Sequence, residues 1–333
     1  MGEIAITGIG CITPWGDEIS SLSKALIMKT QNNSINQVED FDVKRYIMKK
    51  GLRSLQKSTQ MALASTQLAL KDAQHDLKDN EHDRLGVFVG NSMSYLNNIS
   101  DFLDDVYEVG AELVSPIKFP NTVLNNISGW VSIVFDAKGV NNTVNSGNTS
   151  SLDALLLAKN YIENGIIDKA IVVGVEEINL GVLHNEFNGG LPDRKMTEAS
   201  ITLILEKSDL QNNKVYGYLD DIFSWQEHTF NEKDYAYNLE KILSKITSTT
   251  IREVYFGSSN SCDKVTENEV KKMYGDDTDQ YNISSHIGIS YAVSGFIKVV
   301  LSLLNDGKKI IIETNETGNK SVLSIESKRT GKI

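Results

Sequence analysis

Short apolar runs alternate with longer helical patterns along this chain, and that alternation constrains its fold more than any other feature. The apolar runs lie at residues 4–9, 85–89, 171–175, 201–205, 215–219, 254–256 and 310–312. Runs of this length are typical of strands that are buried on both faces of a sheet. Helical spacing of apolar residues is clearest at 58–73, and we expect further helices at 152–164, 234–246 and 292–305. The pattern predicts α/β layers, with helices packed on a mostly parallel sheet.

The chain has 333 residues, of which 40% are hydrophobic, enough for one large core or for two halves of about 150 residues each. No stretch rich in Pro or in Gly and Ser separates the halves. The nearest approach to a seam is the region 180–195, so we expect an N-terminal half at 1–190 and a C-terminal half at 191–333, fused over one core.

The formal net charge of -11 argues against binding to nucleic acid or to an anionic membrane surface, since both attract clustered Lys and Arg. No segment reaches the roughly 18 apolar residues that span a bilayer, and no basic leader precedes the first strand pattern. The two cysteines lie far apart, and the histidines show no metal-binding spacing. We therefore expect a cytoplasmic protein with no metal, cofactor, nucleic acid or membrane partner.

Several short segments carry more specific signals. In order, they are AITGIGCITPWG from Ala5, RLGVFVGNS from Arg84, and the long stretch from Val114 to Ser151 that contains VSPIKFPNTVLNN and VNSGNTSS. Together they resemble the β-ketoacyl-acyl-carrier-protein synthase family over nearly the whole chain. Within the long stretch, the positions that match the family without insertion or deletion are Ser115, Pro116, Pro120, Asn125, Gly129, Gly139 and Ser150. The resemblance implies a thiolase-like, five-layer αβαβα fold made of two duplicated halves.

The resemblance also assigns positions to the catalytic groups. The family's nucleophilic cysteine lies on a tight turn at a helix N-terminus, and that position is Asn148 here. A carboxamide nitrogen cannot hold an acyl chain as a thiolate does, because its lone pair is delocalised into the carbonyl. The family's first histidine, in a His-Gly-Thr-x-Thr motif, corresponds to Phe256 in VYFGSSNS. A phenyl ring cannot carry a proton.

The family's second histidine corresponds to His286 in ISSHIGISYAV. The family lysine five residues earlier is Tyr281 here, and the family glutamate nine residues later is Gly295. Glu267 matches a family carboxylate, and the glycine-rich loop near the C-terminus is reduced to Gly318 in ETNETGNKSVLSIE. The scaffold motifs are thus retained, whereas most of the catalytic residues are replaced.

Structural roles remain open for several of these residues. Asn148 could cap the following helix, because asparagine accepts N–H groups well at such turns. His286 could be a buried histidine held by one hydrogen bond. Cys262 could be a displaced nucleophile, although no histidine close in sequence supports that role, and we expect Cys11 to be structural.

Three functions follow from this pattern of replacement. The favoured one is a condensation-inactive subunit of the chain-length-factor type in fatty acid or polyketide biosynthesis, which pairs with a cysteine-containing ketosynthase and meets an acyl carrier protein. The second is a residual malonyl-carrier decarboxylase. The third is a non-catalytic homodimeric protein that binds acyl chains or serves a structural purpose.

The resemblance finally implies a dimer interface in the segment before the nucleophile turn, where one side chain closes the acyl pocket of the neighbouring subunit. Counting back from Asn148 without gaps places that side chain at Lys118, between Ile117 and Phe119. A charge at the end of an apolar tunnel costs several kcal/mol unless it is paired. We therefore expect Phe119 to fill the role, or Lys118 to turn towards a carboxylate of the partner; the alternative is a surface loop with an exposed lysine.

Overall fold

The structure is a computed structural model, and it describes residues 3–27, 35–74, 81–179, 181, 195–208, 214–228, 231–246, 250–258, 261–315 and 318–330. Ten strands form one sheet in the order β10-β9-β11-β12-β8-β1-β7-β5-β3-β4. The first five in chain order are β1 (Ile4–Ile12), β3 (Leu85–Gly90), β4 (Asn141–Val144), β5 (Lys169–Glu176) and β7 (Ala199–Lys207). The other five are β8 (Val215–Gln226), β9 (Ile251–Phe256), β10 (Asp279–Asn282), β11 (Gly307–Thr314) and β12 (Asn319–Thr330).

The strand order repeats about the junction between β1 and β8. Running outward from it, β1-β7-β5-β3-β4 on one side matches β8-β12-β11-β9-β10 on the other. The pairing directions match as well, with the two innermost pairings antiparallel and the two outermost parallel on each side. We propose that the two repeats divide between β7 and β8. A boundary at 190/191 would separate β7 from β1 and β5, its partners in the sheet.

The expected αβαβα fold of two duplicated halves implies one sheet in each half, but the described strands join the two halves into a single sheet. The join is the antiparallel pairing of Ile4–Ile6 in β1 with residues 217–219 in β8. Each of these strands would otherwise be the edge of its own five-stranded half, with unpaired N–H and C=O groups. A pairing of three residues is enough to make the hydrogen-bonded ladder continuous.

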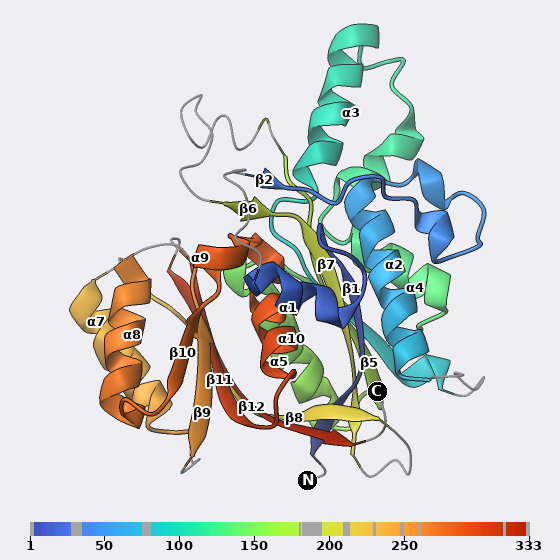
Figure 1. The fold of residues 1–333 in the computed structure, drawn as a ribbon. Helices are drawn as coiled ribbons and strands as arrows, with labels where there is room; N and C mark the ends of the chain where they lie inside the picture. Colours follow the sequence, from blue (N-terminus) through green and yellow to red (C-terminus); the bar gives the residue numbers. More distant parts are fainter. Residues whose placement is uncertain are drawn as a thin grey trace.

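Helices occupy both outer faces of the sheet and the space between its halves (Figure 1). α2 (Lys57–Asp72) and α4 (Asn126–Phe135) cover the N-terminal half, whereas α7 (Glu232–Leu243) and α8 (Ser261–Tyr274) cover the C-terminal half. α5 (Ser150–Glu163) and α10 (Ser294–Ser302) pack against each other in the middle. The result is five alternating layers. The expected helices at 58–73, 152–164 and 234–246 are confirmed as α2, α5 and α7, and the one at 292–305 is divided into a 3₁₀ turn (Tyr291–Val293) and α10.

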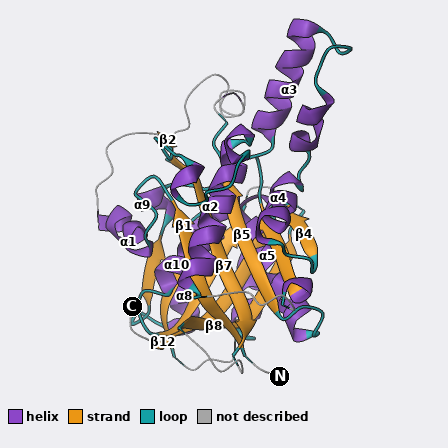
Figure 2. Ribbon diagram, turned by 90° about the vertical axis from the view of Figure 1, so that its right-hand side faces the viewer, coloured by secondary structure: helices purple, strands orange, loops and turns teal. Residues whose placement is uncertain are grey.

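Smaller elements lie around this body. They are α1 (Ile19–Ile27), α9 (Ser284–Ile287) and a two-stranded parallel sheet of β2 (Ile35–Asn36) and β6 (Met196–Thr197). α3 (Leu96–Val109) projects away from the body, and the chain returns from its tip through a 3₁₀ turn at Pro116–Thr122 (Figure 2). None of the described helices combines the length and the apolar character that crossing a membrane requires.

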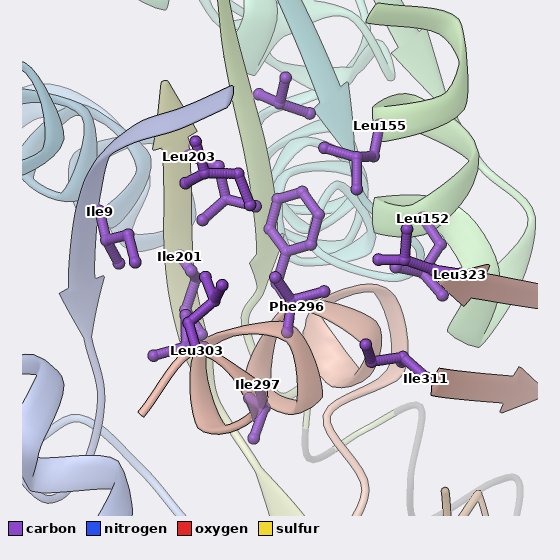
Figure 3. Packing of buried hydrophobic residues seen from close by; sticks show 14 of the residues in the cluster. Ile9, Leu152, Leu155, Ile201, Leu203, Phe296, Ile297, Leu303, Ile311 and Leu323 are labelled. Carbon is purple, nitrogen blue, oxygen red and sulfur yellow. The ribbon is translucent and has the colours of Figure 1, made fainter. Parts of the chain in front are cut away.

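The central core fills the space around α5 and α10 (Figure 3). Phe296 of α10 is fully buried between Leu203 of β7, Leu152 of α5 and Leu323 of β12. Burying a side chain of this size contributes about 1.5–3 kcal/mol. The two helices that fill this core also carry candidate site positions at their N-terminal ends, so packing of the core determines how the site is assembled.

Candidate functional site

The turn between β4 and α5 is a tight elbow at a helix N-terminus. It contains a 3₁₀ turn at Gly147–Thr149 directly before α5. Gly147 has a φ of 68°, and a Cβ there would lie 2.3 Å from Nδ2 of Asn315. This turn therefore requires glycine. Asp153, one turn into α5, accepts a hydrogen bond from the Thr149 hydroxyl at 2.8 Å and fixes the elbow to the helix.

Asn148, at the tip of this elbow, is 6% exposed. Its Nδ2 donates a hydrogen bond to the carbonyl oxygen of Thr314, at the end of β11, at 3.0 Å. Thr149 occupies the N-cap position of α5, and no side-chain capping bond forms there. The helix-cap interpretation of Asn148 is therefore wrong: the amide joins the elbow to another strand instead.

The end of β11 is joined to the elbow by further bonds. Nδ2 of Asn315 and Nδ2 of Asn319 both donate to the carbonyl oxygen of Ser146, at 2.8 and 3.1 Å. The loop between β11 and β12 thus holds the elbow from one side. The sequence did not indicate these two asparagines, although both lie in the degraded glycine-rich segment that the resemblance had identified.

Phe256, the last residue of β9, is buried at 5% exposure in the core beneath α7 and α8, in one cluster with Tyr235, Leu239 and Cys262. Burial in this outer layer gives Phe256 a packing role. Tyr281 of β10 is 38% exposed, and its ring stacks on that of Tyr255 with 5.0 Å between ring centroids. Position 281, where the resemblance implies a lysine, is therefore part of an aromatic pair.

His286 lies in the four-residue helix α9 and is exposed. Its Nδ1 is 3.2 Å from the carbonyl oxygen of Asn282 and 2.9 Å from the hydroxyl of Ser285. The interpretation of His286 as a buried core histidine is therefore wrong. Glu267, the other retained match, is exposed on α8.

Gly295 lies where α10 packs closely against α5. A Cβ at this position would lie 2.6 Å from Cγ of Leu152 and 3.0 Å from the hydroxyl of Ser151. A glutamate could not fit without separating the two central helices. Gly295 therefore serves the packing of the central layer.

A buried ion pair lies one turn further along α10, and the sequence analysis missed it. Lys298 and Glu313 of β11 are both 0% exposed and hydrogen-bonded to each other, and Nζ of Lys298 also donates to the Ser294 hydroxyl at 2.9 Å. Burial raises the pKa of Glu313 to about 7, while the lysine charge opposes that shift. The sequence feature that could have indicated this ion pair is the single lysine inside the apolar helix sequence FIKVVLS.

Both thiols are buried. Burial raises the pKa of Cys11 to about 12, and burial also raises the pKa of Cys262 above its usual range. A reactive cysteine needs the opposite shift, because the thiolate is the nucleophile. Within the described parts of the chain, no group of three or more His, Cys, Asp or Glu side chains could hold a metal ion.

The interface candidates lie on the segment that returns from α3. Lys118 forms an ion pair with Asp105 of α3, within the same chain. Phe119 is 58% exposed and meets Phe102 edge-on, with 6.0 Å between ring centroids. The side chain of Ile117 lies outside the described residues. The expectation that Lys118 needs a carboxylate from a partner is corrected, because α3 supplies one.

Part of the chain is similar in sequence to known proteins. Residues 27–188, just under half of the chain, match the model of the β-ketoacyl synthase N-terminal domain. The 3-oxoacyl-(acyl-carrier-protein) synthase 2 of Vibrio cholerae is 28% identical over 189 residues, which cover 53% of this chain and 46% of that protein. The corresponding enzyme of Coxiella burnetii is 27% identical over 188 residues, covering 52% and 45%. The matched region thus spans about half the length of these curated relatives.

Solved structures match over almost the whole chain. A type II PKS acyl-carrier protein in complex with its ketosynthase bound to the hexaketide contains a chain with a TM-score of 0.87 at 18% identity, covering 98% of this chain and 100% of that one. The ishigamide ketosynthase/chain length factor gives 0.82 at 17% identity, covering 98% and 99%. A β-ketoacyl synthase from Burkholderia phymatum gives 0.83 at 16% identity, covering 99% and 100%. The expected thiolase-like αβαβα fold is confirmed, and residues 27–188 are similar in sequence to the N-terminal domain of the β-ketoacyl synthases.

Proposed function

We propose that this chain is a condensation-inactive, chain-length-factor-type subunit of fatty acid or polyketide biosynthesis that pairs with a cysteine-containing ketosynthase. The single observation that carries the proposal is the bond from Asn148 to the Thr314 carbonyl. The side chain at the elbow, where the resemblance implies a nucleophile, joins two structural elements and offers no thiolate. Both cysteines of the chain are buried, with raised pKa values.

The other replacements support the same proposal because each has a packing role. Phe256 fills the core under α7 and α8, Tyr281 stacks on Tyr255, and Gly295 lets α10 approach α5. Loss of function alone would not require the new side chains to fit so well. A subunit that keeps its fold in order to shape a complex does require it.

A partner surface is supported by exposed apolar side chains on and after α3. The exposed ones are Leu103, Tyr107, Val109, Leu113, Phe119, Val123 and Leu124. They lie on the projecting α3 segment and on the return from it (Figure 2). Exposed apolar side chains gathered on one projecting segment are typical of interaction sites. We name this set the α3 surface and propose that the ketosynthase binds there.

The neighbouring structures suggest the class of partner. One is a ketosynthase/chain length factor, and another is an acyl-carrier protein in complex with its ketosynthase. We therefore propose a ketosynthase as the direct partner and an acyl carrier protein as the donor of its substrate.

Co-expression with a cysteine-containing ketosynthase from the same genome tests the proposal. We expect a stable complex on size-exclusion chromatography, and condensation of acyl and malonyl carriers only when both chains are present. Condensation by this chain alone would contradict the proposal. Release of carbon dioxide from malonyl carrier by this chain alone would instead favour the residual decarboxylase, and a homodimer that binds no ketosynthase would favour the non-catalytic alternative.

A charge substitution locates the partner surface. Leu113→Asp introduces a charge at a 77% exposed position of the α3 surface, where burial against a partner would carry a large desolvation cost. We expect it to abolish co-purification without unfolding the chain. Ile166→Asp is the matched control, because Ile166 is 51% exposed beyond the C-terminal end of α5. Equal binding by both variants would show that the partner contacts another face.

A further inference from the structure

The loops that follow β9 and β10 are held together by one carboxylate, that of Asp263 in the first turn of α8. The backbone N–H of Ser258 donates to Asp263 Oδ1 at 3.1 Å, and Nδ2 of Asn282 donates to Asp263 Oδ2 at 3.1 Å. Each carboxylate oxygen thus serves a different loop. Hydrogen bonds to an ionised acceptor are roughly twice as strong as neutral ones.

Asn282 connects Asp263 to the turn that carries His286. Its Oδ1 accepts hydrogen bonds from the Ser284 hydroxyl at 2.9 Å and from the Ser285 N–H at 3.3 Å, which orients the turn into α9. Its backbone carbonyl oxygen is 3.2 Å from Nδ1 of His286. A proton donated from Nδ1 to this carbonyl places the lone pair of the neutral ring on Nε2.

Gly257 shows independently that the two loops are in close contact. Its φ is 109°, and a Cβ at this position would lie 2.4 Å from Oδ1 of Asn282 and 2.9 Å from the backbone nitrogen of Ser284. A side chain at 257 would push the second loop away. The first loop therefore supports Asn282 both by steric contact and by the hydrogen bond through Asp263.

The same network reaches the elbow. The hydroxyls of Ser258 and Thr314 are hydrogen-bonded to each other, and the Thr314 carbonyl accepts the bond from Asn148. A series of hydrogen bonds thus connects His286 to Asn148 through backbone and side-chain groups of Asn282, Asp263, Ser258 and Thr314, although neither residue contacts the other in the described hydrogen bonds.

We propose that Asp263 and Asn282 form a positioning clasp that sets the orientation of His286 relative to the elbow. Neither residue is assigned a role by the resemblance. The inference deepens the proposed function, because it concerns the histidine of the same site. Its test observes that histidine in the isolated chain and needs neither partner nor condensation, so the clasp and the proposed function can fail separately.

Reversing the hydrogen bond tests the clasp. In Asp263→Asn, the new amide can keep the bond from Ser258 through its oxygen, but its NH₂ group then faces the NH₂ group of Asn282. In Asn282→Asp, two carboxylates face each other, which is unfavourable. The double variant D263N/N282D restores one donor and one acceptor with the direction reversed, and the second carboxylate oxygen at 282 can still accept from Ser284 and Ser285.

Two measurements are made on the purified chain. The imidazole signal of His286 is followed by NMR of histidine-labelled protein and assigned with His286→Gln, and backbone amide exchange is followed at Ser285. We expect each single variant to shift the His286 signal and to speed Ser285 exchange about fivefold or more, the factor that corresponds to one typical net hydrogen bond. We expect the double variant to return both readouts to those of the native chain.

Asp279→Asn is the matched control, because it makes the same change at an exposed carboxylate of β10. It should leave both readouts unchanged. The clasp is refuted if the single variants leave the His286 signal where it was, or if the double variant behaves like the single ones. Should a single variant fail to fold by circular dichroism, the double variant decides: a native histidine signal supports the clasp, and an altered one overturns it.

Discussion

Replacing Asn148 by cysteine tests whether the elbow side chain is structural. The substitution removes the donor of a buried hydrogen bond, 3.0 Å from the Thr314 carbonyl, at a position that is 6% exposed. A buried hydrogen bond contributes about 1 kcal/mol net, and leaving a buried acceptor without its partner costs about 1–3 kcal/mol. We therefore expect Asn148→Cys to lower the free energy of unfolding by about 2 kcal/mol.

Equilibrium unfolding in urea, followed by circular dichroism, measures this loss. Asn268→Cys is the control, because it makes the same exchange at an exposed position of α8. Exposed substitutions typically change stability by no more than about 0.5 kcal/mol. A loss for Asn148→Cys within that range would refute a structural role for the amide.

The same variant addresses catalysis. We expect Asn148→Cys to remain inactive in condensation of acyl and malonyl carriers, because Phe256, Tyr281 and Gly295 leave extender decarboxylation without histidine, lysine or glutamate at these positions. Formation of a condensed product by the purified variant would show that the site needs only a thiol, and the proposal of an inactive subunit would then be wrong.

Three further outcomes are expected. Iodoacetamide should not label the native chain at the elbow, and it should react slowly with Cys11 and Cys262, because the pKa values of both thiols are raised. Rapid labelling of either cysteine, measured by mass spectrometry, would contradict this expectation. Gly295→Ala should destabilise the chain by about 1–3 kcal/mol through overpacking of the central helices, and an unchanged thermal midpoint would contradict that packing. Burial raises the pKa of Glu176 and of Glu313 to about 7 each, so the folded state binds more protons than the unfolded state between the ordinary glutamate value of 4.5 and about 7. Their contribution is therefore present below 4.5 and is lost as the pH rises to about 7. Urea midpoints taken across this range should show the native chain losing stability relative to Glu313→Leu as the pH rises, and a difference between the two that does not change with pH would contradict this.

The sequence by itself indicated most of the strands that are buried on both faces. The runs at 85–89 and 171–175 became β3 and β5, since continuous apolar residues are stable only where both faces of a strand are covered. The interior strand β12 was not predicted, and neither were the short strands β4 and β10. The sequences of the two short strands, NNTV and DQYN, are polar, and both strands lie at the ends of the sheet order. Edge strands of this kind carry no apolar signal.

The resemblance also placed Asn148 on a tight turn at a helix N-terminus, but it could not identify the partner of the amide. That partner, the Thr314 carbonyl, is 166 residues away along the chain. The ion pair between Lys298 and Glu313 and the close approach at Gly295 likewise depend on how α10 packs against α5 and β11. A periodic pattern shows which face of an element is buried, whereas hydrogen-bond partners and close contacts are decided by the packing of the two repeats on each other, because residues distant in sequence meet only there.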